Sequence, residues 1–262
     1  MKKDKSFLVS VIMNCYNGEK YLKKSVKSLL SQKYKNWELI FWDNQSTDNS
    51  KKILLSFKDN RLKYFHSNIF SNLYKARNQA IKKAKGKFIC FLDTDDWWSK
   101  NKLSRQVELI NSNKEVNFIY TNFYVYDQKT KKKKIVFAKK MKEGKITQTL
   151  LDRYNVGILT VMINKKFFKK KGFKEKYKIM GDFDFFINLS LKENFYSIQD
   201  PLAYYRVHND NFSKKIDIFY SECKSWISEN EKKFLKFNYS IFYIKMNFFK
   251  LWIKIILKHV FS

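Results

Sequence analysis

Glycine, proline and cysteine are scarce in this chain of 262 residues, which has six glycines, one proline and three cysteines. Gly18 is the only glycine among the first 85 residues, so the chain lacks the glycine-rich phosphate loop that a nucleotidyltransferase normally carries near its N-terminus. The cysteines Cys15, Cys90 and Cys223 are odd in number and too widely spaced for C-x-x-C metal or redox pairs. We therefore expect three reduced thiols and a cytoplasmic protein, with nucleotidyl transfer kept as an alternative function.

Arginine is scarce as well, because it supplies only five of the 54 cationic residues, which face 24 acidic ones. The formal net charge of +30 is thus nearly all lysine. Proteins that read base edges or clamp phosphates rely on the bidentate arginine fork, whereas lysine is a strongly hydrated point charge. This composition disfavours a nucleic-acid-binding protein, an alternative that would predict tight and steeply salt-dependent binding to DNA or RNA. We expect no nucleic-acid partner.

Long uncharged runs are also missing, since none reaches the ~18 residues that a membrane span requires. The lysine-rich residues 1–10 run directly into an apolar stretch without a small-residue cleavage site, so we expect no secretory signal. The 44% of hydrophobic and 18% of aromatic residues exclude a disordered basic tail. Length and composition predict one large α/β domain, or such a domain with a smaller appendage.

Four apolar runs of strand length occupy the first third of the chain, at residues 7–13, 37–42, 62–65 and 88–92. Between them, apolar residues recur at helical spacing, as in Leu73, Ala76 and Ala80. Strands that alternate with helices predict a doubly wound, mostly parallel sheet. Ligands of such sheets bind beyond the carboxyl ends of the strands.

Carboxylates and amides follow three of these runs, in residues 14–17 (NCYN), 43–44 (DN) and 93–96 (DTDD). The D-x-D after a buried strand places two carboxylates close enough to share one hard divalent cation. Mg²⁺ or Mn²⁺ is usually held by one or two carboxylates together with substrate phosphates. Aspartates also abound in solvated turns and helix caps, which is the alternative interpretation. The position directly after a core strand favours the metal site.

Five segments together resemble the family 2 glycosyltransferases with a GT-A fold. Three of them, VSVIMNCYNGEKYL, WELIFWDNQSTDNS and ARNQAIKKAKGKFICFLDTDD, lie within residues 7–110 in the order and at the spacing of the family. The resemblance resumes at residues 181–191 (GDFDFFINLSL) and 204–213 (YYRVHNDNFS). It implies a metal-dependent transfer of a sugar from a nucleotide-diphosphate donor to an acceptor hydroxyl, with inversion at the anomeric carbon.

The resemblance also implies a division of the chain. We expect a GT-A domain at residues 1–213, with a nucleotide-sugar half at about 7–110 and an acceptor half at about 111–213. Residues 214–262 would form a basic helical tail.

Donor contacts follow from the resemblance, residue by residue. Tyr16 would pack on the nucleotide base, Asp43 would hydrogen-bond the base or ribose, and Arg77 would lie on the nucleotide side. Arg206 belongs to a segment that binds the donor in the family. We expect a UDP-linked donor.

The resemblance places a Mn²⁺ or Mg²⁺ ion at the D-x-D. Asp95 would be a direct ligand and Asp93 would contact the ribose or the metal. The physical reason for the ion is that a nucleoside diphosphate leaves with extra negative charge, which a divalent cation stabilises. The family often has a histidine near the metal and diphosphate, and His208 fits that position; a purely structural histidine is an equal alternative.

A general base must take the proton of the acceptor hydroxyl, and Asp182 is the candidate. It opens an apolar helical pattern, where a helix N-terminus favours an ionised carboxylate. A plain N-cap role for Asp182 is the alternative, and Asp184 is the rival base.

The chain departs from the family pattern at several positions. Asn14 stands in place of a common proline, Asn44 and Gln45 replace an acid and a glycine, and Gly181 replaces the acid that usually precedes the base. None of these changes removes the metal site or the base, whereas Asn44 and Gln45 bear on the details of base and ribose recognition. The Q-x-x-R-W motif and the membrane spans of chain polymerases are missing, which favours non-processive transfer of one sugar.

The positive charge is concentrated in the middle of the chain. Residues 128–178 contain 18 lysines and arginines but only three acids, and the run Lys131 to Lys134 predicts the tip of a hairpin between residues 124–127 and 135–138. This surface would suit a phosphorylated acceptor or one carried on anionic lipid. A solvated lysine-rich face is an equal alternative.

The segment 241–261 reads as a basic amphipathic helix, with Lys250, Lys254 and Lys258 along one stripe and aromatic and aliphatic residues around it. Such a helix is typical of a segment lying in a membrane interface. Packing of this helix on the body of the protein or in a homodimer is the alternative.

We expect a bacterial enzyme of lipooligosaccharide, capsule or other surface-glycan biosynthesis. It would act on a glycan or glycolipid acceptor and be peripheral on the cytoplasmic face of the inner membrane.

Overall fold

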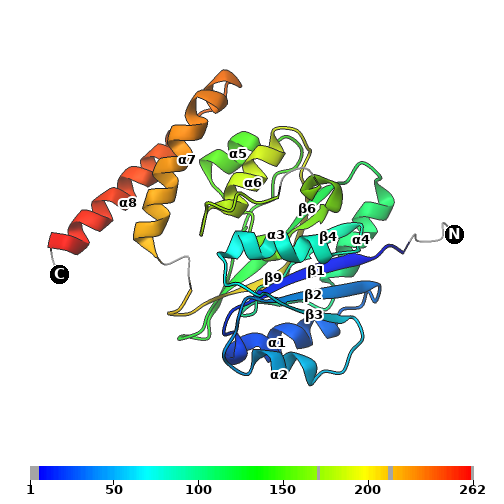
Figure 1. Ribbon diagram of the computed structural model, residues 1–262. Coiled ribbons are helices and arrows are strands. Elements are labelled where there is room, and N and C mark those ends of the chain that lie inside the picture. The colour runs from blue at the N-terminus through cyan, green and yellow to red at the C-terminus, as the bar shows by residue number, and fades with distance from the viewer. Residues whose placement is uncertain (1–5, 170–171, 212–214, 261–262) are drawn as a thin grey trace.

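The computed structural model describes residues 6–169, 172–211 and 215–260 of the chain. Within this part, nine strands form one sheet in the order β3-β2-β1-β4-β8-β6-β9-β5, and β7 pairs with β6. Helices cover both faces of the sheet, and a pair of long C-terminal helices projects beyond it (Figure 1).

The first half of the sheet is parallel, as predicted. It contains β1 (Val9–Cys15), β2 (Trp37–Asp43), β3 (Leu62–His66) and β4 (Phe88–Phe91). The residues of β1, β2 and β4 are almost all buried because helices cover both faces, which explains their continuous apolar sequences. Their carboxyl ends meet at one edge, since Cys15 is in register with Asp43.

The second half of the sheet is mixed. The strand β8 (Met162–Asn164) is antiparallel to β4 and to β6 (Phe118–Asp127), whereas β9 (Tyr196–Val207) is parallel to β6 and pairs with β5 (Trp97–Trp98). The predicted lysine-rich hairpin is present, because β7 (Lys133–Ile135) pairs with residues 124–126 of β6. Two lysines of the run therefore lie in a strand rather than in the turn.

The buried apolar residues form two hydrophobic cores, one on each face of the sheet, because successive side chains of a strand point to opposite faces. One core lies under α1 (Glu19–Leu30), α2 (Ser50–Leu55) and α4 (Lys102–Ser112). The other lies under α3 (Leu73–Lys83), α5 (Thr147–Asp152) and α6 (Gly181–Ser190). Short 3₁₀ turns at Ile158–Thr160 and Lys165–Phe168 flank β8.

The C-terminal helices are α7 (Ile216–Lys236) and α8 (Phe242–Val260), so the predicted tail helix is confirmed. They lie side by side, with the rings of Tyr220 and Phe248 stacked at 4.6 Å (Figure 1). The turn between them is fixed to α5, because Gln148 and Ser240 exchange two hydrogen bonds of 2.9 and 3.0 Å. The expected domain boundary at 213/214 falls in residues 212–214, outside the described residues. Among the helices described, none is long and apolar enough to cross a membrane.

Candidate active site

The polar loops after β1 and β2 form one side of the site. Asp43 is buried at the end of β2, where its carboxylate accepts hydrogen bonds from the Tyr64 hydroxyl at 2.7 Å and from the Ser46 backbone at 2.8 Å. Tyr16 is 56% exposed, and its ring meets the ring of Phe70, itself 54% exposed, at 4.8 Å. Two exposed aromatic rings beside a buried carboxylate make a surface on which a planar ligand can stack.

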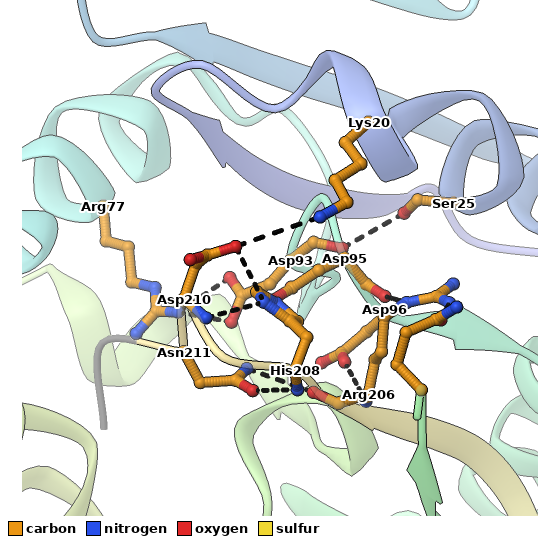
Figure 2. A network of polar contacts seen from close by, with 11 residues as sticks. Lys20, Ser25, Arg77, Asp93, Asp95, Asp96, Arg206, His208, Asp210 and Asn211 are labelled. Carbon is orange, nitrogen blue, oxygen red and sulfur yellow. Dashed lines mark hydrogen bonds and ion pairs between the residues drawn. The ribbon is translucent and has the colours of Figure 1, made fainter. Parts of the chain in front are cut away.

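Asp93 and Arg77 form an ion pair behind the loop that follows β4. The Arg77 guanidinium is buried on α3, and its Nη2 contacts both carboxylate oxygens of Asp93, at 2.8 and 3.0 Å (Figure 2). Burial opposes the charged form of Arg77, but the attraction of Asp93 prevails and raises the pKa of the guanidinium. The pair fixes the first carboxylate of the D-x-D.

Asp95 contacts His208, which lies just beyond the end of β9. The Nε2 atom of His208 is 2.9 Å from Oδ2 of Asp95, across 113 residues of sequence (Figure 2). Burial and the neighbouring Asp93 raise the pKa of Asp95, while the hydrogen bond from His208 opposes that rise. The structure thus brings together the carboxylate and the histidine that the sequence placed at the metal.

Asp96 and Arg206 lock β9 to the same loop. The buried carboxylate of Asp96 accepts the backbone N–H of Arg206 at 2.8 Å, and Nε of Arg206 donates to the Asp95 carbonyl at 2.7 Å. The Arg206 guanidinium lies 4.4 and 4.7 Å from the rings of Tyr21 and Trp97. These contacts position the D-x-D loop against His208, and the donor-binding role of Arg206 stays a prediction.

The ligand set suits a cation that completes its coordination with substrate. No group of three or more His, Cys, Asp or Glu side chains in the described part of the chain is arranged to hold a metal ion by itself. Asp93 is engaged by Arg77, which leaves Asp95 and His208 as the adjacent candidate ligands. Mg²⁺ and Mn²⁺ sites built from one or two protein ligands and the oxygens of a diphosphate have this character.

Asp182 lies in the first turn of α6, as predicted. Its Oδ1 is 2.9 Å from the Tyr74 hydroxyl, and its Oδ2 is 3.5 Å from the hydroxyl of Tyr154. Burial raises the pKa of Asp182, although Arg77 and the Tyr74 hydrogen bond act in the opposite direction. A carboxylate with a raised pKa and no cationic side chain bonded to it is suited to accept a proton.

Asp184 has a different environment, because it is tied into the scaffold. Its Oδ1 accepts hydrogen bonds from Lys174 at 2.9 Å, from the Trp226 indole at 3.0 Å and from Asn188 at 3.2 Å. Trp226 belongs to α7 and is fully buried. This carboxylate therefore joins α6 to α7, and the geometry favours Asp182 over its rival as the base.

Sequence reasoning did not single out several residues of the site, among them Phe70, Tyr74, Asp96 and Tyr154. The aspartate could have been noted, since it ends the DTDD cluster, but no signal separates its role from those of its neighbours. The aromatic residues resemble ordinary core or surface residues in sequence. Only the folded chain shows where their rings and hydroxyls lie.

Comparisons with known proteins agree on one protein family. The model of the Glycosyl transferase family 2 matches residues 10–187. An Escherichia coli protein named UDP-Glc:alpha-D-GlcNAc-diphosphoundecaprenol beta-1,3-glucosyltransferase WfgD is 35% identical over 189 residues, which cover 72% of this chain and 71% of that protein. The putative teichuronic acid biosynthesis glycosyltransferase TuaG of Bacillus subtilis is 33% identical over 212 residues, covering 79% of this chain and 81% of its own.

Solved structures confirm the predicted GT-A fold. Residues 1–349 of Staphylococcus aureus TarS in complex with UDP-GlcNAc match with a TM-score of 0.66 and 19% identity, over 84% of this chain and 66% of that chain. The Pyrobaculum calidifontis mannosyltransferase PcManGT in complex with GDP-Man and Mn²⁺ matches with a TM-score of 0.62 and 13% identity, over 87% of this chain and 64% of that chain. This chain thus spans about two thirds of each solved chain.

Proposed function

Because the chain belongs to glycosyl transferase family 2, we propose that it is an inverting transferase that moves one sugar from a UDP-linked donor to a hydroxyl of a lipid-linked glycan. The observation that carries this proposal is the contact of Asp95 with His208 at 2.9 Å, at the edge where the loops after β1, β2 and β4 meet. That edge is where a doubly wound sheet binds its ligand.

The donor nucleotide has a suitable surface beside this contact. Tyr16 and Phe70 present exposed rings on which a base can stack, and the buried Asp43 holds the loop beneath them. A uridine donor is supported by relatives, since the WfgD protein is named for UDP-Glc and TarS was solved with UDP-GlcNAc. UDP-glucose is therefore the first donor to test.

Asp95 and His208 would hold Mn²⁺ or Mg²⁺, and Arg77 would keep Asp93 in place beside them. When bound, such an ion stabilises the negative charge that develops on the departing diphosphate. A precedent for Mn²⁺ beside a nucleotide sugar in this fold is the PcManGT complex.

Asp182 would act as the general base. Its carboxylate takes the proton from the acceptor hydroxyl while the acceptor oxygen bonds to the anomeric carbon and the bond from that carbon to the diphosphate oxygen breaks. Attack on the face opposite the leaving group inverts the anomeric configuration. Burial, which raises the pKa of Asp182, makes its carboxylate a better proton acceptor than an exposed one.

The helical tail and the relatives support a proposal for the acceptor and the site of action. The helix α8 exposes several large apolar side chains: Phe242, Phe249, Trp252, Ile253 and Ile256. The exposed side chains of Lys250 and Lys254 accompany them. Aromatic and aliphatic residues next to lysines suit the interface of an anionic membrane. Since the WfgD protein is named for a diphosphoundecaprenol-linked acceptor, we propose peripheral attachment to the cytoplasmic face of the membrane and a role in surface-glycan biosynthesis.

A thermal-shift screen tests the donor proposal. The protein is heated with UDP-glucose, UDP-GlcNAc, GDP-mannose or no ligand, each with and without Mn²⁺. We expect a Mn²⁺-dependent rise in Tm with a UDP-sugar, which Asp95→Ala abolishes and the surface variant Asp200→Ala does not. The proposal is wrong if no nucleotide sugar raises Tm, or if Asp95→Ala behaves like the parent protein.

A further inference from the structure

We propose that Tyr74 is a positioning residue for Asp182, and that its hydroxyl serves both the ionised and the protonated form of that carboxyl group. The inference rests on the proposed role of Asp182 as the general base. During transfer the base changes from carboxylate to carboxylic acid, so its surroundings must accommodate both forms. Tyr74 provides this without any movement of heavy atoms.

The Tyr74 hydroxyl has one hydrogen and two acceptors within reach. The Tyr74 oxygen lies 2.6 Å from the Ile179 carbonyl oxygen and 2.9 Å from Oδ1 of Asp182. A phenol has one hydrogen to donate and lone pairs with which to accept, and neither a carbonyl nor a carboxylate can donate. When Asp182 is ionised, the two acceptors therefore compete for a single hydrogen.

Protonation of Asp182 removes this competition. The new O–H of Asp182 can donate to the Tyr74 oxygen, and the Tyr74 hydrogen can point entirely to the carbonyl of Ile179. All three oxygens are then joined in one chain of hydrogen bonds. Apart from the proton added to Asp182, rotation of one hydroxyl hydrogen is the only change between the two arrangements.

The ring of Tyr74 is held firmly enough to keep these distances. It is 2% exposed and packs against the ring of Phe173 at 5.4 Å. A Cβ atom on Gly181 would lie 2.6 Å from three ring carbons of Tyr74, so the ring contacts the backbone directly before the base. Gly181 stands where the family pattern has an acid, and the Tyr74 ring occupies the space that a side chain there would need.

The titratable and charged groups that face Asp182 are Tyr74 and Arg77 from α3 and Tyr154 from the segment after α5. Tyr154 reaches the other carboxylate oxygen at the long distance of 3.5 Å and packs edge-on against Phe183. A hydroxyl at 2.9 Å should thus affect the ionisation of Asp182 more than one at 3.5 Å. Arg77 acts through its charge alone, since its hydrogen bonds go to Asp93.

The predicted effect has a definite sign. The negative charge of the ionised carboxylate draws the shared Tyr74 hydrogen towards Oδ1 of Asp182. Since a hydrogen bond to an ionised carboxylate is stronger than one from a neutral acid, removal of the Tyr74 hydroxyl should destabilise the ionised form more. The pKa of Asp182 then rises. Because the base must be ionised to act, the acidic limb of the pH profile of kcat/KM should move to higher pH, by about one unit.

The test compares Tyr74→Phe and Tyr154→Phe with a matched control, Tyr177→Phe. The Tyr177 ring is also buried, but its hydroxyl has no hydrogen-bond partner among the described residues. Full-length variants are assayed by UDP release across pH 5 to 9, and donor affinity serves as the check of folding. We expect a rise of about one unit in the acidic limb for Tyr74→Phe, a smaller rise for Tyr154→Phe and none for the control.

A second measurement keeps the inference testable if Tyr74→Phe folds poorly. Incorporation of 3-fluorotyrosine at position 74 retains the ring and strengthens the hydroxyl as a donor, so the acidic limb should move to lower pH. An unchanged limb in both Tyr74 proteins would overturn the inference. If instead Asp182→Asn remains active, the proposed base itself is wrong, which separates the two failures.

Discussion

Substitution of Asp184 should affect the stability of the fold, whereas substitution of Asp182 should affect catalysis. Asp184 is 3% exposed and accepts hydrogen bonds from Lys174, Trp226 and Asn188, whereas Asp182 contacts only tyrosine hydroxyls through its side chain. We predict that Asp184→Ala destabilises the fold and that Asp182→Asn slows transfer by about 10²–10⁴-fold. Each change should leave the other property nearly intact.

The size of the Asp184→Ala effect follows from its partners. The buried indole N–H of Trp226 would lose its acceptor, which costs about 1–3 kcal/mol. The side chain of Lys174 is 43% exposed, so solvent screens that ion pair and its loss adds at most about 1 kcal/mol. The free energy of unfolding should therefore fall by about 1–4 kcal/mol. Asp184→Asn keeps an oxygen for the indole and should cost about half as much.

Urea unfolding followed by tryptophan fluorescence measures the first effect, and UDP release per folded molecule measures the second. Asp182→Asn should unfold near the parent midpoint, because it removes a carboxylate whose ionised form burial disfavours. The assignment of roles is refuted if Asp184→Asn abolishes turnover while the protein remains as stable as the parent.

Three further predictions concern other parts of the chain. Arg77→Met leaves the first carboxylate of the D-x-D without its partner, so we expect at least a tenfold weaker donor affinity by calorimetry; an unchanged affinity would contradict this role. Burial lowers the pKa of Lys102 to about 8 from its ordinary value of 10.5. Between these two pH values the unfolded state binds more protons than the folded state, so the free energy of unfolding should rise with pH over this range, by about 3 kcal/mol. Urea midpoints at several pH values should show this rise in the parent and not in Lys102→Met. On α8, the double variant Phe249→Glu with Ile253→Glu should bind anionic vesicles at least tenfold more weakly in sedimentation. The exposed-surface control Leu55→Glu should bind as the parent does, and equal binding of all three proteins would argue against the membrane helix.

Local patterns in the sequence were sufficient to predict the parallel half of the sheet. The runs at 7–13, 37–42 and 88–92 are apolar because both faces of their strands are covered, and the polar residues after them lie at the predicted edge of the sheet. The start of α6 at Gly181 was predicted for a similar reason, since apolar residues recur at helical spacing after it.

The mixed half of the sheet could not be predicted in the same way. The strands β5, β7 and β8 have two or three residues each, which is too short for a periodic pattern, and β7 reads KKI. Their pairing depends on partners elsewhere in the chain. A helical tail at residues 214–262 was predicted, but the packing of α8 against α7 was not, because only the structure shows Phe248 against Tyr220.

The contacts within the site could be predicted from the sequence only in part. The resemblance placed Asp95 and His208 at the same ion, and the structure brings them into contact across 113 residues. By contrast, Tyr74 lies on the apolar face of α3 and looks like a core residue, although its hydroxyl reaches Asp182 across 108 residues. The sequence left Asp184 as a rival of Asp182, and the contacts of Asp184 with Lys174 and the buried indole of Trp226 separate the two. Such contacts depend on tertiary packing, which spacing along the chain does not encode.

The most direct test of the proposed chemistry is transfer from UDP-glucose to a GlcNAc-diphosphate lipid acceptor by the parent protein and by Asp182→Asn. The account predicts a product of inverted anomeric configuration, and an Asp182→Asn protein that binds the donor with parent affinity but transfers about 10²–10⁴ times more slowly. Transfer by Asp182→Asn at the rate of the parent protein, or a product of retained configuration, would contradict it.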